Sequence, residues 1–105
     1  MRQKSRKDLN QTAVVEKLRE LGYDVDVVER PYDIVVSGNR WLTCGRQHCV
    51  RCSLRVELKS LKGKLSESQK EYIKNLRYPD SYIVATSSAE DPMPAVREIE
   101  KWFGN

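Results

Sequence analysis

The chain has 105 residues, of which 39% are hydrophobic and 32% are charged, and a net charge of +4, which suits one domain with a modest core. Its basic residues are concentrated at the N-terminus and around a cysteine cluster, and this asymmetry favours a polyanionic partner, with nucleic acid first. No apolar run approaches the roughly 20 residues that cross a bilayer, and no secretory signal is visible. We therefore expect a cytoplasmic protein without membrane contact, whose three cysteines are not a disulfide framework.

Residues 1–7 are predicted to form a flexible basic arm, and residues 8–21 an amphipathic helix. Four apolar residues share one face of this helix at helical spacing: Val14, Val15, Leu18 and Leu21. Gly22 supplies the residue expected just past a helix C-terminus. Gln11 falls near the apolar face, where a polar side chain needs a partner, so it is the candidate functional residue of this helix.

Extended segments follow the first helix. Residues 23–29 alternate valines with acidic residues, which predicts an edge strand with a solvated acidic face. A second strand begins at Asp33 and is predicted to end at a turn over residues 37–39. Residues 40–43 then form the return arm of a hairpin, and residues 44–52 form a Cys-rich hairpin excursion.

The stretch from Leu54 to Ser60 predicts the central strand. With a period of two, its apolar side chains face a core, and the opposite face carries Arg55, Glu57 and Lys59. A carboxylate and an ammonium on one strand can simply form a solvated ion pair, which contributes little to stability. The strand by itself therefore leaves both a structural and a functional role open.

A helix, a strand and a closing helix are predicted in the C-terminal half. Ser66 and Gln69 stand in the S-x-x-Q relation of a capping box at the start of the first of these helices. The buried side of this helix is expected to consist of Tyr72, Ile73 and Leu76. Residues 81–86 form the strand and residues 94–103 the closing helix. The order α-β-β-β-α-β-α predicts a single α/β domain over residues 1–105, with a mixed β-sheet flanked by helices.

The polar residues of two neighbouring strands carry the chemistry. Asp33 opens one strand, and Glu57 lies on the next. Two carboxylates that converge at strand ends make a hard-oxygen site suited to Mg²⁺ or Mn²⁺, to which the backbone carbonyl of Leu58 can add an oxygen. Lys59 points the same way as Glu57, and it can orient an attacking water or balance charge on a pentavalent phosphate. With the metal as Lewis acid, such a site suits phosphodiester hydrolysis.

The order of these residues is similar to a known family. Pro31-Tyr32-Asp33, then Glu57-Leu58-Lys59, then Leu65 and Gln69 resemble the motif of the PD-(D/E)XK nuclease superfamily, and most of all its small phage-borne VRR-NUC and Holliday-junction-resolvase-like members. The resemblance covers residues 8–87. It implies a PD-(D/E)XK-type core that cleaves branched or otherwise structured DNA. A homodimer with two sites would let so small a protein span a junction.

The resemblance also implies roles for single residues. Asp33 and Glu57 would bind the metal, and Lys59 would be the catalytic lysine. Gln69 would be an auxiliary polar residue of the helix after the motif, although as a capping-box partner it could serve only the start of that helix. Gln11 stands where many relatives carry a glutamate that assists the metal or its waters, which leaves one-metal and two-metal mechanisms open.

The cysteines form a cluster of their own. Cys44, Cys49 and Cys52 follow a C-x4-C-x2-C spacing, with His48 beside Cys49. These three thiols and one imidazole fit a structural Zn²⁺ site, because tetrahedral zinc accepts Cys₃His ligands. The spacing is also similar to plant-type iron–sulfur loops without their fourth cysteine, and a reduced loop without metal is the third alternative. Zinc would order the hairpin tip and present its arginines to a phosphate backbone.

Basic residues of the arm, the cysteine loop, the central strand and the following turn are the expected DNA contacts. They are Arg2, Lys4, Arg6, Lys7, Arg46, Arg51, Arg55, Lys62 and Lys64. A non-catalytic nucleic-acid-binding module would use the same arm and loop, with Glu57 and Lys59 merely paired. The two functions diverge at Asp33, because a nuclease needs its carboxylate and a binding module does not.

Overall fold

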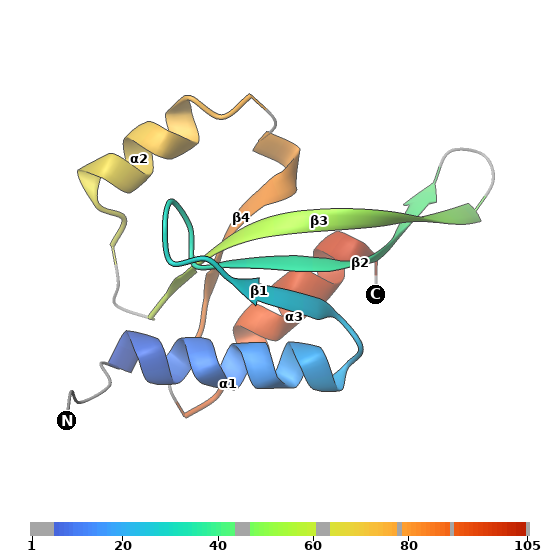
Figure 1. The fold of residues 1–105 in the computed structure, drawn as a ribbon, viewed down its shortest axis with the longest axis horizontal. Helices are drawn as coiled ribbons and strands as arrows, with labels where there is room; N and C mark the ends of the chain where they lie inside the picture. The colour runs from blue at the N-terminus through green and yellow to red at the C-terminus, as the bar shows by residue number, and fades with distance from the viewer. Residues whose placement is uncertain (1–5, 44–46, 61–63, 78, 89, 105) are drawn as a thin grey trace.

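A computed structural model describes residues 6–43, 47–60, 64–77, 79–88 and 90–104 (Figure 1). In chain order, its helices and strands are α1 (Arg6–Glu20), β1 (Asp24–Val27), β2 (Ile34–Thr43), β3 (Gln47–Lys59), α2 (Glu67–Lys74), the short 3₁₀ helix η1 (Pro79–Ser81), β4 (Tyr82–Thr86) and α3 (Met93–Phe103). Within the described residues, the α-helices and strands therefore follow the predicted order α-β-β-β-α-β-α.

The described strands form one mixed sheet in the order β1-β2-β3-β4. β2 pairs antiparallel with both β1 and β3, whereas β3 and β4 run parallel. α2 lies in the connection between β3 and β4, because parallel strands need a long crossover and cannot be joined by a tight hairpin. The predicted α/β class, with a mixed sheet and flanking helices, is confirmed.

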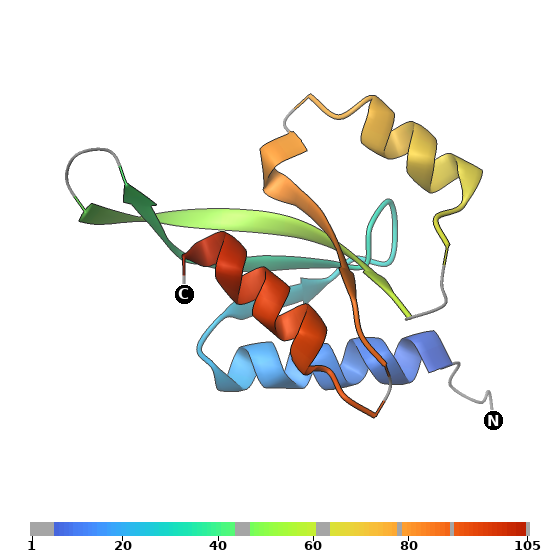
Figure 2. The same cartoon turned by 180° about the vertical axis from the view of Figure 1, so that it is seen from behind.

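Two helices, α1 and α3, cover one face of the sheet (Figures 1 and 2). The alternation of β3 turns its apolar side chains toward these helices, and Leu54, Val56 and Leu58 are fully buried there. Helix residues such as Leu18 of α1 and Phe103 of α3 complete this core and are also fully buried. The charged side chains of β3 consequently face the opposite side, where α2 lies.

The predicted turn over residues 37–39 is wrong. β2 continues from Ile34 to Thr43 without interruption, so residues 40–43 are not a return arm. The pairing of β2 with β3 extends along the whole strand, from Ile34 opposite Val56 to Thr43 opposite Gln47. Gly38 therefore lies inside a strand.

Gly38 allows close packing in this strand. A Cβ atom at this position would lie 2.7 Å from Cδ1 of Tyr23 and 3.6 Å from Cε1 of Phe103. The rings of Tyr23 and Phe103 also contact each other, with centroids 5.0 Å apart. The Tyr23 ring thus occupies the space that a side chain at position 38 would need, which explains a glycine inside this strand.

α2 begins with a capping box, as predicted. The Gln69 N–H donates to Ser66 Oγ at 3.2 Å, and the Ser66 N–H donates to Gln69 Oε1 at 2.9 Å, so two backbone donors at the helix start are satisfied. The extent to which this helix is buried was predicted wrongly. Tyr72, Ile73 and Leu76 are only half-buried, because α2 lies away from the layer that α1 and α3 form (Figure 1).

Candidate active site

Asp33 and Glu57 lie on the face of the sheet opposite to α1 and α3. Ile34 pairs with Val56 in the β2–β3 register, so Asp33, one residue before β2, lies across from Glu57 and shares its face. The exposed fractions of the two residues are only 3% and 1%. The structure thus brings together the two carboxylates that the sequence placed on neighbouring strands.

Lys59 lies beside Glu57 on the same face of β3. Its Nζ is 3.4 Å from Glu57 Oε1, and the exposed fractions of the two side chains are 15% and 2%. This pair is therefore not a solvated surface ion pair but a largely desolvated one, whose charges interact strongly with their surroundings. Asp33, Glu57 and Lys59 together bring two carboxyl groups and one amino group to the same face of the sheet.

The Asp33 carboxylate is held against the backbone of β3. Its Oδ2 accepts a hydrogen bond of 2.7 Å from the N–H of Leu58, the residue between Glu57 and Lys59. The N–H and C=O of one strand residue point to the same side, so the Leu58 carbonyl also faces Asp33. The Asp33 carbonyl in turn accepts from the Val28 N–H at 2.9 Å, which fixes the loop that leads into β2.

Gln69 links α2 to these carboxylates. Its Nε2 donates to Glu57 Oε1, while its Oε1 accepts the Ser66 N–H of the capping box. The two ends of one amide therefore serve the helix start and the site at the same time, so the two roles left open by the sequence are compatible. We call Asp33, Glu57, Lys59 and Gln69 the carboxylate site.

The carboxylate site fits a divalent cation of the Mg²⁺ type. Its donors are hard oxygens, and proteins commonly hold Mg²⁺ through one or two carboxylates together with water and substrate phosphate. Both carboxylates are buried, and a divalent cation between them would offset part of the cost of removing them from water. Asp33, Glu57 and the Leu58 carbonyl are the groups that would hold the ion. Across the described residues, no group of three His, Cys, Asp or Glu side chains is placed to hold a metal.

A cleft of about 520 Å³ opens onto Glu57. One wall comes from the loop before Asp33 (Glu29, Arg30 and Pro31), and the other from α2 and its N-cap (Ser66, Ser68, Gln69 and Tyr72). Glu57 is almost fully buried and still lines this cavity, which we call the site cleft. A substrate can therefore reach the carboxylate site between the loop and α2.

Three tyrosines gather beside the carboxylate site, and the sequence did not predict their cluster. Tyr32, Tyr72 and Tyr82 come from the loop before β2, from α2 and from β4, and their ring centroids are 5.7 to 6.5 Å apart. Arg55 of β3 donates to the Tyr72 hydroxyl at 3.2 Å and to Ser81 Oγ at 3.0 Å. The only sign of this cluster in the sequence was the position of Tyr32 next to Asp33, because the other two tyrosines reach the cluster through tertiary packing.

The environment of Tyr82 raises the pKa of its hydroxyl to about 12 from an ordinary value of 10.0. Burial is the largest cause, followed by the negative charge of Glu57; Tyr72 and Asp33 add to the rise, and Arg55 opposes it. The Tyr82 hydroxyl is also buried without a hydrogen-bond partner among the described residues. The folded protein therefore favours the neutral, protonated form of the Tyr82 side chain.

We expect Tyr82→Phe to flatten the pH dependence of stability in the alkaline range. The raised pKa means that the folded protein holds this proton more tightly than the unfolded chain, so the stabilisation is complete below pH 10 and is lost as the pH rises to about 12. Urea unfolding of wild type and variant across this range measures the effect. Removal of an unsatisfied hydroxyl should also leave the variant at least as stable at neutral pH. An unchanged pH dependence in the variant would contradict this assignment.

Among the side chains of α1 that the structure describes, the buried polar residue is Asn10 and not Gln11. Asn10 is 2% exposed, whereas Gln11 is half-buried. The Asn10 Nδ2 donates to the Ser87 carbonyl at 3.1 Å, and the Ser87 N–H donates to the Lys59 carbonyl at 3.0 Å. Asn10 thus connects α1 to the strand that carries Lys59. A signal was present in the sequence, because Asn10 precedes Val14 by four residues and shares its face.

The predicted DNA contacts are distributed over several surfaces. Most of them fall outside the described side chains: Arg2, Lys4, Arg6, Lys7, Arg46 and Lys62. Lys64 is exposed. Arg51 is exposed too, and it forms an ion pair with Asp24 of β1. Arg55, in contrast, is half-buried and lies against Tyr72 near the carboxylate site.

The predicted zinc ligands fall largely outside the described residues. Cys44 is not described, and only the backbone of β3 is described at His48 and Cys49. Cys52 is half-buried and packs against the hydrophobic core. The structural zinc site remains a prediction.

No protein-family model, curated protein or solved structure matches this chain. In the described part of the chain, no helix is long and apolar enough to cross a membrane. The function must therefore be argued from the residues of the site.

Proposed function

We propose that this protein is a metal-dependent nuclease that hydrolyses DNA phosphodiester bonds at the carboxylate site. The observation that carries the proposal is the burial of Asp33 and Glu57 beside Lys59, where Glu57 also lines the site cleft. A fold gains little stability from such a buried cluster of charged groups. Clusters of this kind are typical of catalytic sites.

The residues of the site have separate roles in this proposal. When bound, Mg²⁺ or Mn²⁺ supplies a Lewis acid for the phosphate and a more acidic water. Asp33 and Glu57 hold the ion, and the hydrogen bond from Leu58 to Asp33 keeps the first carboxylate in place. Gln69 orients Glu57 through its amide. Lys59 is placed to orient the attacking water or to balance charge on the phosphate.

The resemblance to PD-(D/E)XK nucleases, noted in the sequence, supports the same function. The observed element order and the proximity of Asp33, Glu57, Lys59 and Gln69 agree with that motif. By the same resemblance, we propose branched or structured DNA as the substrate and a homodimer as the form that cuts it.

The competing function is a nucleic-acid-binding module in which Glu57 and Lys59 are only an ion pair. An exposed pair would favour that alternative, because surface ion pairs form readily and contribute little. The 2% exposure of the Glu57 side chain and its hydrogen bond from Gln69 favour the nuclease.

We expect wild-type protein to cut labelled DNA in Mg²⁺ or Mn²⁺ and to lose this activity in EDTA. Four-way, flapped and linear DNA of matched sequence should be compared, and the branched forms should be cut faster. The activity should co-elute with the protein on size exclusion, which excludes a contaminating nuclease. Binding of all three DNAs without metal-dependent cutting would refute the nuclease and favour the binding module.

A further inference from the structure

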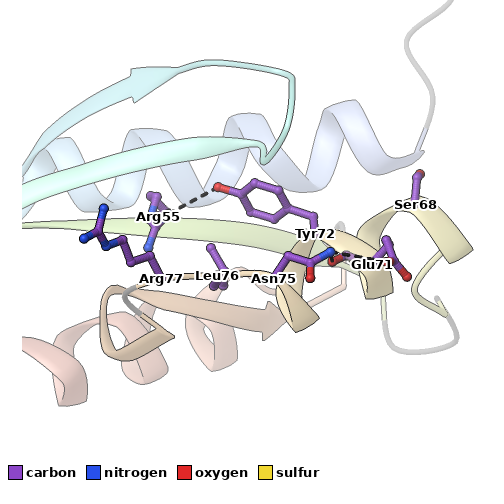
Figure 3. A pocket seen from close by; sticks show the side chains of 7 residues that line it. All are labelled: Arg55, Ser68, Glu71, Tyr72, Asn75, Leu76 and Arg77. Atoms are coloured by element: carbon purple, nitrogen blue, oxygen red, sulfur yellow. Dashed lines mark hydrogen bonds between the residues drawn. The ribbon is translucent and has the colours of Figure 1, made fainter.

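A second cavity adjoins the site cleft. It measures about 540 Å³ and lies between β3 and α2, with Arg55, Ser68, Tyr72, Leu76 and Arg77 in its lining (Figure 3). We call it the arginine cleft. In Figure 3, the two arginines lie at one end of this cavity and Ser68 at the other.

The arginine cleft and the site cleft meet at two residues. Ser68 and Tyr72 line both cavities, and both belong to the first turns of α2. A chain molecule whose reacting group lies at Glu57 can therefore continue past Tyr72 into the arginine cleft. Glu57 and Arg55 lie two residues apart on the same face of β3, or about 6.6 Å along the strand.

The lining of the arginine cleft suits a nucleotide. The Arg55 guanidinium is oriented by the Tyr72 hydroxyl at 3.2 Å and by Ser81 Oγ at 3.0 Å, whereas Arg77 is exposed. The acidic residue of the lining, Glu71, accepts a hydrogen bond from Asn75 Nδ2 at 3.2 Å. Guanidinium groups bind phosphate, and the ring of Tyr72 offers an apolar face to a base or a sugar.

We infer that the arginine cleft binds an unpaired nucleotide of the substrate, adjacent to the phosphate that is cut. This inference rests on the proposed nuclease function and adds a substrate class to it. A cavity of about 540 Å³ accommodates a molecule of nucleotide size, but a duplex, whose major groove alone is ~12 Å wide, cannot enter it. Proteins that bind single strands combine a basic groove with aromatic side chains, which is the composition found here.

The cavity is also open away from the carboxylate site. Arg77 lines a third hollow of about 370 Å³ together with Arg40, Ser53 and Trp102. The guanidinium of Arg40 lies 3.9 Å from the centroid of a Trp102 ring. The arginine cleft and this third hollow therefore share Arg77 in their linings.

Arg77→Ala tests this assignment, with Arg97→Ala as the matched control. Both arginines are exposed and both changes remove one positive charge, but Arg97 belongs to α3 on the other face of the sheet. Binding is measured in EDTA, so that no DNA is cut, to a blunt duplex and to the same duplex with an unpaired tail. We expect Arg77→Ala to weaken binding of the tailed DNA by about tenfold, because a hydrogen bond to a charged group contributes ~1.5–3 kcal/mol. For the tailed DNA, the slope of the logarithm of the binding constant against the logarithm of the salt concentration should also become shallower by about one unit.

The blunt duplex should bind wild type and both variants alike. Equal losses for tailed and blunt DNA, equal losses in Arg97→Ala, or no loss in Arg77→Ala would each overturn the assignment. The nuclease proposal and the arginine cleft can be refuted independently of each other. Tail binding through Arg77 without any metal-dependent cutting would refute the nuclease alone, whereas cutting without an effect of Arg77 would refute the arginine cleft alone.

Discussion

Glu57→Gln is expected to lower metal-dependent DNA cleavage by about 10³-fold while the protein stays folded. In the proposed mechanism a bound metal would contribute several kcal/mol of transition-state stabilisation, and each 1.36 kcal/mol corresponds to about a factor of ten in rate. The amide keeps the shape of the side chain and an oxygen for the hydrogen bond from Gln69, but it removes the negative charge that would hold the ion. Single-turnover cleavage rates with saturating Mn²⁺ measure the loss.

Metal binding gives an independent measurement of the same change. A ligand that binds only the folded state raises the melting temperature, so Mn²⁺ should stabilise wild type but not Glu57→Gln. The matched control is Glu98→Gln, because Glu98 is exposed and belongs to α3 on the other face of the sheet. This control should keep both the cleavage rate and the Mn²⁺ effect. Full activity of Glu57→Gln would show that the carboxylate is structural.

Gly38→Ala is expected to destabilise the fold by about 1–3 kcal/mol, the usual cost of overpacking a close-packed core. The added methyl group would lie 2.7 Å from the Tyr23 ring, and the ring is itself held against Phe103. For a domain of this size, each kcal/mol corresponds to a decrease of ~4–8 °C in melting temperature. Urea or thermal unfolding followed by circular dichroism measures the effect.

A double-mutant cycle identifies the cause of that loss. In a Tyr23→Leu background the aromatic ring is absent, so Gly38→Ala should cost less than ~0.5 kcal/mol there. The difference between the two backgrounds is the interaction energy of the two positions. The same cost in both backgrounds would mean that the loss arises in the backbone of β2 and not from contact with Tyr23.

The sequence was most informative where neighbouring residues determine the structure. The capping box of α2 involves only Ser66 and Gln69, and it is formed as predicted. The two faces of β3 follow from a period of two, which places Leu58 in the core and Glu57 on the opposite face. These features depend on residues a few positions apart, so a linear pattern carries them.

Contacts between distant segments were predicted less well from the sequence. The sequence shows Gly38 between polar residues, which is typical of a turn, but the ring of Tyr23 from another segment decides its role. The helical pattern of α1 does not fix the rotation of the helix to within one residue. Asn10 is buried instead of Gln11 because it meets the carbonyl of Ser87, 77 residues further along the chain.

The element order, the α/β class and the charged face of β3 were determined by the sequence alone, through periodicity and capping. The candidate site was predictable in its charged members, because Glu57 and Lys59 belong to a strand whose faces could be assigned, and Asp33 directly precedes the neighbouring strand. Only the tertiary structure decided that these charges are buried, that Gln69 bonds to Glu57, and that Tyr32, Tyr72 and Tyr82 meet. Burial depends on what packs over a residue, and the covering groups here come from a loop, a helix and a strand that are far apart in the chain.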